Sequence, residues 1–168
     1  MSNPNALTEA IIVWAATRSD EVVFDPKSAY YSFEIVADAF EKGKEFGKKE
    51  INERLRQIYF KNAQTGVEAL NKILDNLKEN NCVPSKIFVK NSIQGVTILL
   101  SLNPKVYEQE KDIDFAYNVS ATLQSEYHKT NFNLIISFIN ETPNFNFNLL
   151  KSDGYGLAYD IEKDVQIY

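Results

Sequence analysis

Residues 33–58 read FEIVADAFEKGKEFGKKEINERLRQI, and the spacing of apolar residues in this stretch decides the fold of the first half. Apolar or small residues recur at every third or fourth position, which is the spacing of one face of an α-helix. This stripe consists of Phe33, Val36, Phe40, Gly43, Gly47, Ile51, Leu55 and Ile58, and the helical pattern continues with Ala63, Val67, Leu70, Leu74 and Leu77. The sequence therefore predicts a long amphipathic N-terminal helix and a second helix after it.

The ends of these helices follow from local signals. Asp25-Pro26 is a favourable helix start, because Asp caps helices and Pro suits the first helical position. Thr65 and Glu68 have the spacing of a capping box, which favours a break near residues 62–65 over one helix from about 26 to 80. We predict two helices, at about 27–62 and 66–80.

The second half of the chain has strand character. Strands are expected at 86–90, 95–103, 132–140, 144–150 and 155–159, with a helix at 112–129 and a short tail containing Val165 and Ile167. This β-β-α-β-β-β order predicts a two-layer α+β domain with a mostly antiparallel sheet and one packed helix. The expected regions are an apolar N-terminal segment at 1–25, a helical region at 26–81 and the α+β domain at 82–168, with a core shared between the two halves.

The composition excludes several classes of site. The 168 residues include one His and one Cys, which excludes an intramolecular disulfide and any Cys-rich zinc or iron–sulfur site. The net charge of −5 is spread over both halves, so broad electrostatic binding to nucleic acid is not expected. A lone cysteine without a signal peptide favours the cytoplasm. The Lys- and Asn-rich, Arg-poor composition is typical of an AT-rich bacterial or phage genome.

The apolar run Ala10–Ala16 is too short to span a membrane, which needs about 20 residues. We interpret it as a buried helix or strand, with a segment that docks in a groove of a partner as the alternative.

Few residues suggest chemistry. The alternating carboxylates of Glu108, Glu110, Asp112 and Asp114 are candidate ligands for a hard cation, although a solvated loop leading into a capped helix is the simpler interpretation. His128, the only imidazole, is expected to interact with a helix C-terminus. Lysines and arginines on the first helix alternate with glutamates, as on a solvated face. No nucleotide-binding, hydrolase or kinase motif is present, and no cofactor is expected.

Gly43 and Gly47 lie on the stripe, where each glycine costs about 1 kcal/mol relative to Ala. They indicate either a weak point in the helix or a close contact with another helix. The sequence favours a non-catalytic interaction protein, a homo-oligomer (a dimer above all) or the binder of a protein partner, with immunity or antitoxin proteins as an analogy. Its predicted interaction residues are Phe33, Val36, Phe40, Gly43, Gly47, Ile51 and Leu55. The alternatives are a small metal-dependent hydrolase or nuclease and, less favoured, nucleic-acid binding through the basic helix.

Overall fold

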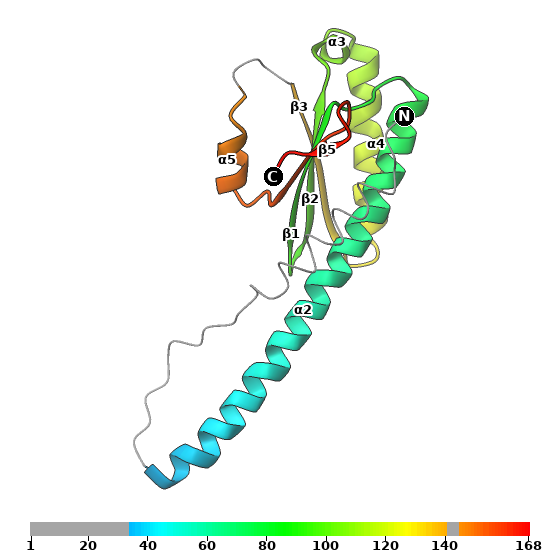
Figure 1. Cartoon of the computed structure of the whole chain (residues 1–168). Coiled ribbons are helices and arrows are strands. Elements are labelled where there is room, and N and C mark those ends of the chain that lie inside the picture. Colours follow the sequence, from blue (N-terminus) through cyan, green and yellow to red (C-terminus); the bar gives the residue numbers. More distant parts are fainter. Residues whose placement is uncertain (1–33, 141–144) are drawn as a thin grey trace.

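The computed structural model describes residues 34–140 and 145–168, with side chains from residue 43 onward. Two long helices cover one face of a five-stranded sheet, and a short helix lies against the other face (Figure 1). The elements are α2 (Glu34–Glu79), β1 (Lys86–Ser92), β2 (Gly95–Leu102), α3 (Pro104–Tyr107), α4 (Glu110–His128), β3 (Asn133–Asn140), α5 (Phe147–Ser152), β4 (Leu157–Asp160) and β5 (Val165–Gln166). The predicted α+β class, with a long N-terminal helix, is confirmed.

The sheet has the strand order β3-β2-β1-β4-β5 and is mostly antiparallel, as predicted. β1 pairs antiparallel with both β2 and β4, and β4 pairs antiparallel with β5. β2 and β3 are parallel, because α3 and α4 connect them and carry the chain back to the end of the sheet at which β2 begins. Gly95 begins β2 with a φ of 146°, and a Cβ there would lie 2.0 Å from the carbonyl oxygen of Asn133. Only glycine fits this position.

The main core lies between the sheet and the helices α2 and α4. Alternate strand residues such as Ile87, Ile98 and Ile136 face these helices and are almost fully buried. The second half of α2 contributes Val67, Leu70, Ile73 and Leu77, and α4 contributes Ala116, Leu123 and Tyr127. The helical region and the sheet therefore share one core. Burying each of the Val, Leu and Ile side chains of this core stabilises the fold by about 1.5–3 kcal/mol.

α2 is one continuous helix, so the predicted break between 27–62 and 66–80 is wrong. Thr65 and Glu68 lie inside the helix, because burial continues without interruption from Ala63 through Val67 and beyond. The predicted helix start at Asp25-Pro26 lies outside the described residues. The predicted end is confirmed, since Asn81 adopts a φ of 58° and the Cys82 amide donates to the Leu77 carbonyl at 2.9 Å. This is a Schellman termination.

The predicted strand at 144–150 is also wrong. Within it, Phe147 begins the short helix α5, because the Asn146 side chain accepts a hydrogen bond from the Asn148 amide at 3.0 Å and caps the helix. The alternation of apolar residues was misleading, since Leu149 is 62% exposed. Phe145 and Phe147 instead pack on Phe88. The tail supplies the fifth strand, β5.

Candidate interaction surface

The first half of α2 projects away from the sheet, as Figure 1 shows in blue and cyan. At a rise of 1.5 Å per residue, the 46 residues of α2 span about 69 Å. Buried side chains begin only at Tyr59 and end at Leu77. None of the side chains between residues 43 and 58 is buried. We call residues 34–58 the α2 arm. In the part of the arm whose side chains are described, residues 43–58, every residue is exposed or half-buried.

The predicted interaction residues lie on this arm. Gly43 and Gly47 are within the continuous helix, and a Cβ built on either one meets no atom within 4 Å. Ile51 is 47% exposed and Leu55 is half-buried. Val36 and Phe40 belong to the helix, but their side chains are outside the described part, as is the whole of Phe33. The space around both glycines can accept another backbone.

The stripe of the arm is a different face from the one that packs on the sheet. Between Ile58 and Ala63 the apolar spacing changes to five residues, and five residues turn a helix by roughly 500°, which shifts the face by roughly 140°. The interpretation of one stripe running from Phe33 to Leu77 therefore needs correction. α2 has one apolar face for the domain core and another on the arm.

Sequence reasoning missed Phe46, which is 73% exposed and is the most exposed large apolar side chain among the described residues. It lies one position before Gly47, about 100° around the helix from the stripe. Its position therefore did not match the three- and four-residue spacing. The signal available in the sequence was a large aromatic residue among the charged residues of a predicted helix.

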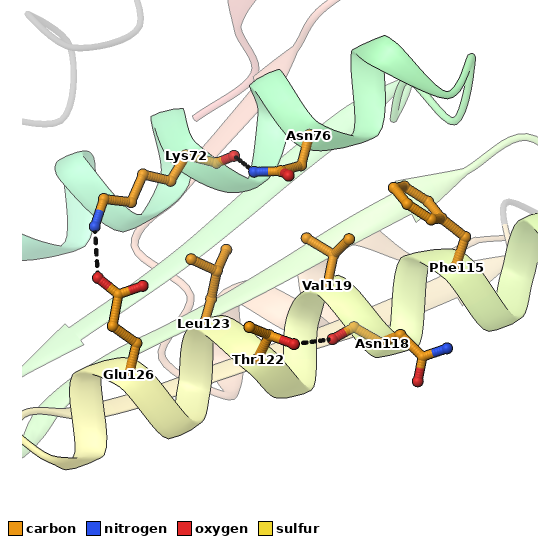
Figure 2. A pocket seen from close by; sticks show the side chains of 8 residues that line it. All are labelled: Lys72, Asn76, Phe115, Asn118, Val119, Thr122, Leu123 and Glu126. Atoms are coloured by element: carbon orange, nitrogen blue, oxygen red, sulfur yellow. Dashed lines mark hydrogen bonds and ion pairs between the residues drawn. The ribbon is translucent and has the colours of Figure 1, made fainter.

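A shallow groove of about 420 Å³ lies between α2 and α4 (Figure 2). Val119 and Leu123 of α4 form an apolar strip along it, and an exposed ion pair closes one end, with Lys72 Nζ 2.9 Å from Glu126 Oε1. The hydrogen bond with Glu126 and the nearby Tyr127 raise the pKa of Lys72. The side chains of Asn76 and Thr122 each donate a hydrogen bond to a backbone carbonyl group of their own helix. The groove thus presents no nucleophile with an adjacent base.

The candidate metal ligands are spread along the chain at the start of α4. Glu108 is the C-cap of α3, while Glu110 and Asp112 lie in the first turn of α4, where carboxylates stabilise the positive end of the helix. Asp114 follows within α4 and is exposed. Within 34–140 and 145–168, no three His, Cys, Asp or Glu residues are grouped so that they could hold a metal ion.

The single histidine and the single cysteine of the sequence lie at positions that structural roles explain. His128 is the exposed last residue of α4, where the sequence placed it. Cys82 is buried, and its thiol lies 3.4 Å from the Asn80 carbonyl oxygen and 3.8 Å from that of Asp112. Burial raises the pKa of this thiol, with a smaller contribution from Asp112. A neutral buried thiol is a poor nucleophile.

Comparison with known proteins gives no relative: no protein-family model, no curated protein and no solved structure matches this chain. Nor does any helix in the part of the chain that the structure describes have the length and apolar character required to cross a membrane. The surfaces of the molecule are therefore the basis for proposing its function.

Proposed function

We propose that this chain is a non-catalytic interaction protein that binds a protein partner or a second copy of itself through the α2 arm. The observation that supports this most is that residues 43–58 form a helix without one buried side chain, although the stripe and Phe46 provide apolar surface. Helices in water gain most of their stability from packing an apolar face. A second chain on the arm would supply that packing.

The chemistry of the described surface supports the same proposal. The groove between α2 and α4 is polar at its rim and lacks a catalytic constellation, and the thiol of Cys82 is buried. By contrast, Phe46 and Ile51 expose apolar surface on one helix, which is typical of docking sites. An immunity- or antitoxin-like role in a bacterium or phage, acting in the cytoplasm, is the biological form of the proposal and rests on analogy.

The test is sedimentation of the full chain from 1 to 200 µM, alone and with each protein encoded beside it. Ile51→Glu places a charge on the arm, and we expect it to abolish the association that the unaltered chain shows. Ile93→Glu is the matched control, because Ile93 is also 47% exposed but lies in the turn between β1 and β2. Equal association of both variants would contradict the proposal, as would a chain that binds neither itself nor any co-encoded protein.

A further inference from the structure

We propose that Asn62 and Asn91 form an anchor that fixes the direction in which the α2 arm leaves the domain. The anchor consists of two hydrogen bonds from side-chain amides to backbone carbonyl groups, and both bonds connect α2 with the end of β1. This inference goes beyond the proposed function, because it concerns how the arm is held and not what the arm binds.

The two bonds of the anchor run in opposite directions. Asn91 Nδ2 of β1 donates to the Tyr59 carbonyl of α2 at 2.9 Å, and Asn62 Nδ2 of α2 donates to the Ser92 carbonyl of β1 at 2.8 Å. Tyr59 and Asn62 lie about one helical turn apart, while Asn91 and Ser92 are consecutive in the strand. Because both acceptors belong to the backbone, neither can move by rotation of a side chain. Two points of attachment restrict both the position of the helix and its tilt.

The end of β1 gives the anchor a well-defined base. The Ser92 hydroxyl donates to the Gly95 carbonyl at 3.0 Å and accepts a hydrogen bond from the Gln94 amide at 3.2 Å. Gly95 in turn lies directly against the backbone of Asn133 in β3. The turn between β1 and β2 is therefore held both by its own hydrogen bonds and by the neighbouring strand.

The anchor lies at the boundary between the arm and the packed part of α2. Tyr59 is the first buried residue among the described side chains of this helix, and Ala63 is the next. From Ala63 to Leu77 the helix belongs to the core, whereas no side chain between residues 43 and 58 is buried. A helix that projects from its support tilts most easily about the last contacts with that support. Contacts at this boundary therefore decide the direction of the arm.

Asn91 contributes more to geometry than to stability. It is only 9% exposed, and its Oδ1 is buried without a hydrogen-bond partner among the described residues. Leaving a buried acceptor unpaired costs more than a typical hydrogen bond contributes. An apolar side chain of similar size would thus stabilise the fold at least as well, but it would not supply a directional bond to the Tyr59 carbonyl. A buried polar group with this balance serves to specify one arrangement of the elements that it joins.

Pulsed electron paramagnetic resonance measures the direction of the arm. Nitroxides on Lys49→Cys of the arm and Ala121→Cys of α4 occupy exposed positions, and the buried Cys82 of the unaltered chain serves as the labelling control. Dilution into an excess of unlabelled chain restricts the measurement to distances within one molecule. Lys49 lies about 20 Å along the axis from Asn62, so a tilt of the arm by about 20° displaces its label by about 7 Å.

We expect one narrow distribution of distances in the chain with its anchor intact. Asn91→Leu should at least double the width of this distribution while leaving the urea midpoint unchanged or higher, and the double variant with Asn62→Ala should widen it further. Asn62 is half-buried, so Asn62→Ala alone is the second variant if the core does not accept a leucine. Asn76→Ala is the matched control, because the Asn76 amide bonds to the Lys72 carbonyl of its own helix, and it should leave the width unchanged.

Three results would overturn the anchor: a broad distribution in the chain with both amides, an unchanged width in the double variant, or equal widening by Asn76→Ala. None of these results depends on whether the arm binds a partner. A chain that binds neither itself nor a co-encoded protein, but whose distribution widens as expected, would overturn the proposed function and leave the anchor standing. For the docking role of the arm, a fixed direction reduces the orientational freedom that is lost on binding.

Discussion

Three glycines of α2 have different surroundings although they share one helix. Gly43 and Gly47 on the arm have no atom within 4 Å of a built Cβ. Gly66 packs against the sheet, where a Cβ would lie 2.9 Å from Cγ2 of Val96, a residue that is itself almost fully buried. The first pair leaves space for a contact, whereas Gly66 allows α2 to lie close to β2.

Gly66→Ala is therefore expected to lower the free energy of unfolding by about 1–2 kcal/mol, because overpacking against Val96 outweighs the gain of about 1 kcal/mol in helix propensity. Urea denaturation at 1 µM protein measures the change. Gly47→Ala is the matched control and should leave stability unchanged or raise it by up to about 1 kcal/mol. A Gly66→Ala variant more stable than the unaltered chain would show that the core beside Val96 has space for a methyl group.

Two tyrosines, the buried Tyr159 and the half-buried Tyr107, connect stability to alkaline pH. Burial raises the pKa of Tyr159 to about 12, and its hydroxyl also donates a hydrogen bond to Asp164 at 2.5 Å. Burial likewise raises the pKa of Tyr107 to about 12, with a smaller contribution from Tyr117. Because an unfolded tyrosine titrates near 10, the stability from the neutral hydroxyls is fully present below pH 10 and is lost as the pH rises through 12.

We therefore expect the free energy of unfolding to fall between pH 10 and pH 12. Tyr159→Phe and Tyr107→Phe should each make this fall shallower, and the double variant should make it shallower still. Urea midpoints measured at half-unit steps of pH provide the slope. An unchanged slope in the double variant would show that other groups control alkaline unfolding.

At the scale of elements, α4 protects the edge of the sheet. β3 is an edge strand of eight residues, and such edges invite pairing with another chain. The Ile136 amide donates to Gln124 Oε1 at 3.2 Å, and the Ser120 hydroxyl donates to the Ile136 carbonyl at 3.2 Å. Gln124 also donates to the Ser120 hydroxyl at 3.0 Å. Side chains of α4 therefore form hydrogen bonds with the backbone amide and carbonyl of Ile136, at the centre of this strand.

Gln124→Ala is expected to cost about 1–2 kcal/mol, because it leaves the Ile136 amide without its partner. Thr122→Ala on the same helix is the control, since the Thr122 hydroxyl bonds only to the Asn118 carbonyl of α4 and the residue is exposed. Its cost should stay within about 0.5 kcal/mol. Thermal unfolding of both variants gives the comparison, and equal costs would argue against protection of the edge by Gln124.

These elements also show how far the sequence predicts the structure. The helical periodicity of α2 and α4 and the buried alternation in β3 predict those elements, because burial on one face imposes the pattern directly. The periodicity is compatible with α2 continuing past Thr65, but the capping-box spacing favours a break there. The break is absent because packing on the sheet outweighs this local signal. The periodicity does not distinguish α5 from a strand, because Phe145 and Phe147 are two residues apart in both interpretations. The stripe identifies Gly43, Gly47 and Ile51 on the arm. The five-residue step from Ile58 to Ala63 shows a change of face only once α2 is known to be one continuous helix.

At the scale of the whole molecule, α2 belongs to two regions of different stability. From Ala63 to Leu77 it is part of the core, so its amide hydrogens should exchange only through global unfolding. From residue 43 to residue 58 no side chain is buried, so opening the arm exposes little apolar surface and costs little free energy. One helix without a break can therefore open from one end while the domain stays folded.

Hydrogen exchange measured by mass spectrometry is expected to show this difference within α2. At 1 µM, amides of the arm should exchange at least a hundredfold faster than those between Ala63 and Leu77. At 200 µM, self-association through the arm should slow exchange within the arm and leave the domain unchanged, because ordering by a partner acts only on the segment that it covers. Uniform protection along α2 at 1 µM would mean that the arm is stabilised within a single chain. The concentration dependence thus tests whether the arm acquires its stability from a second molecule.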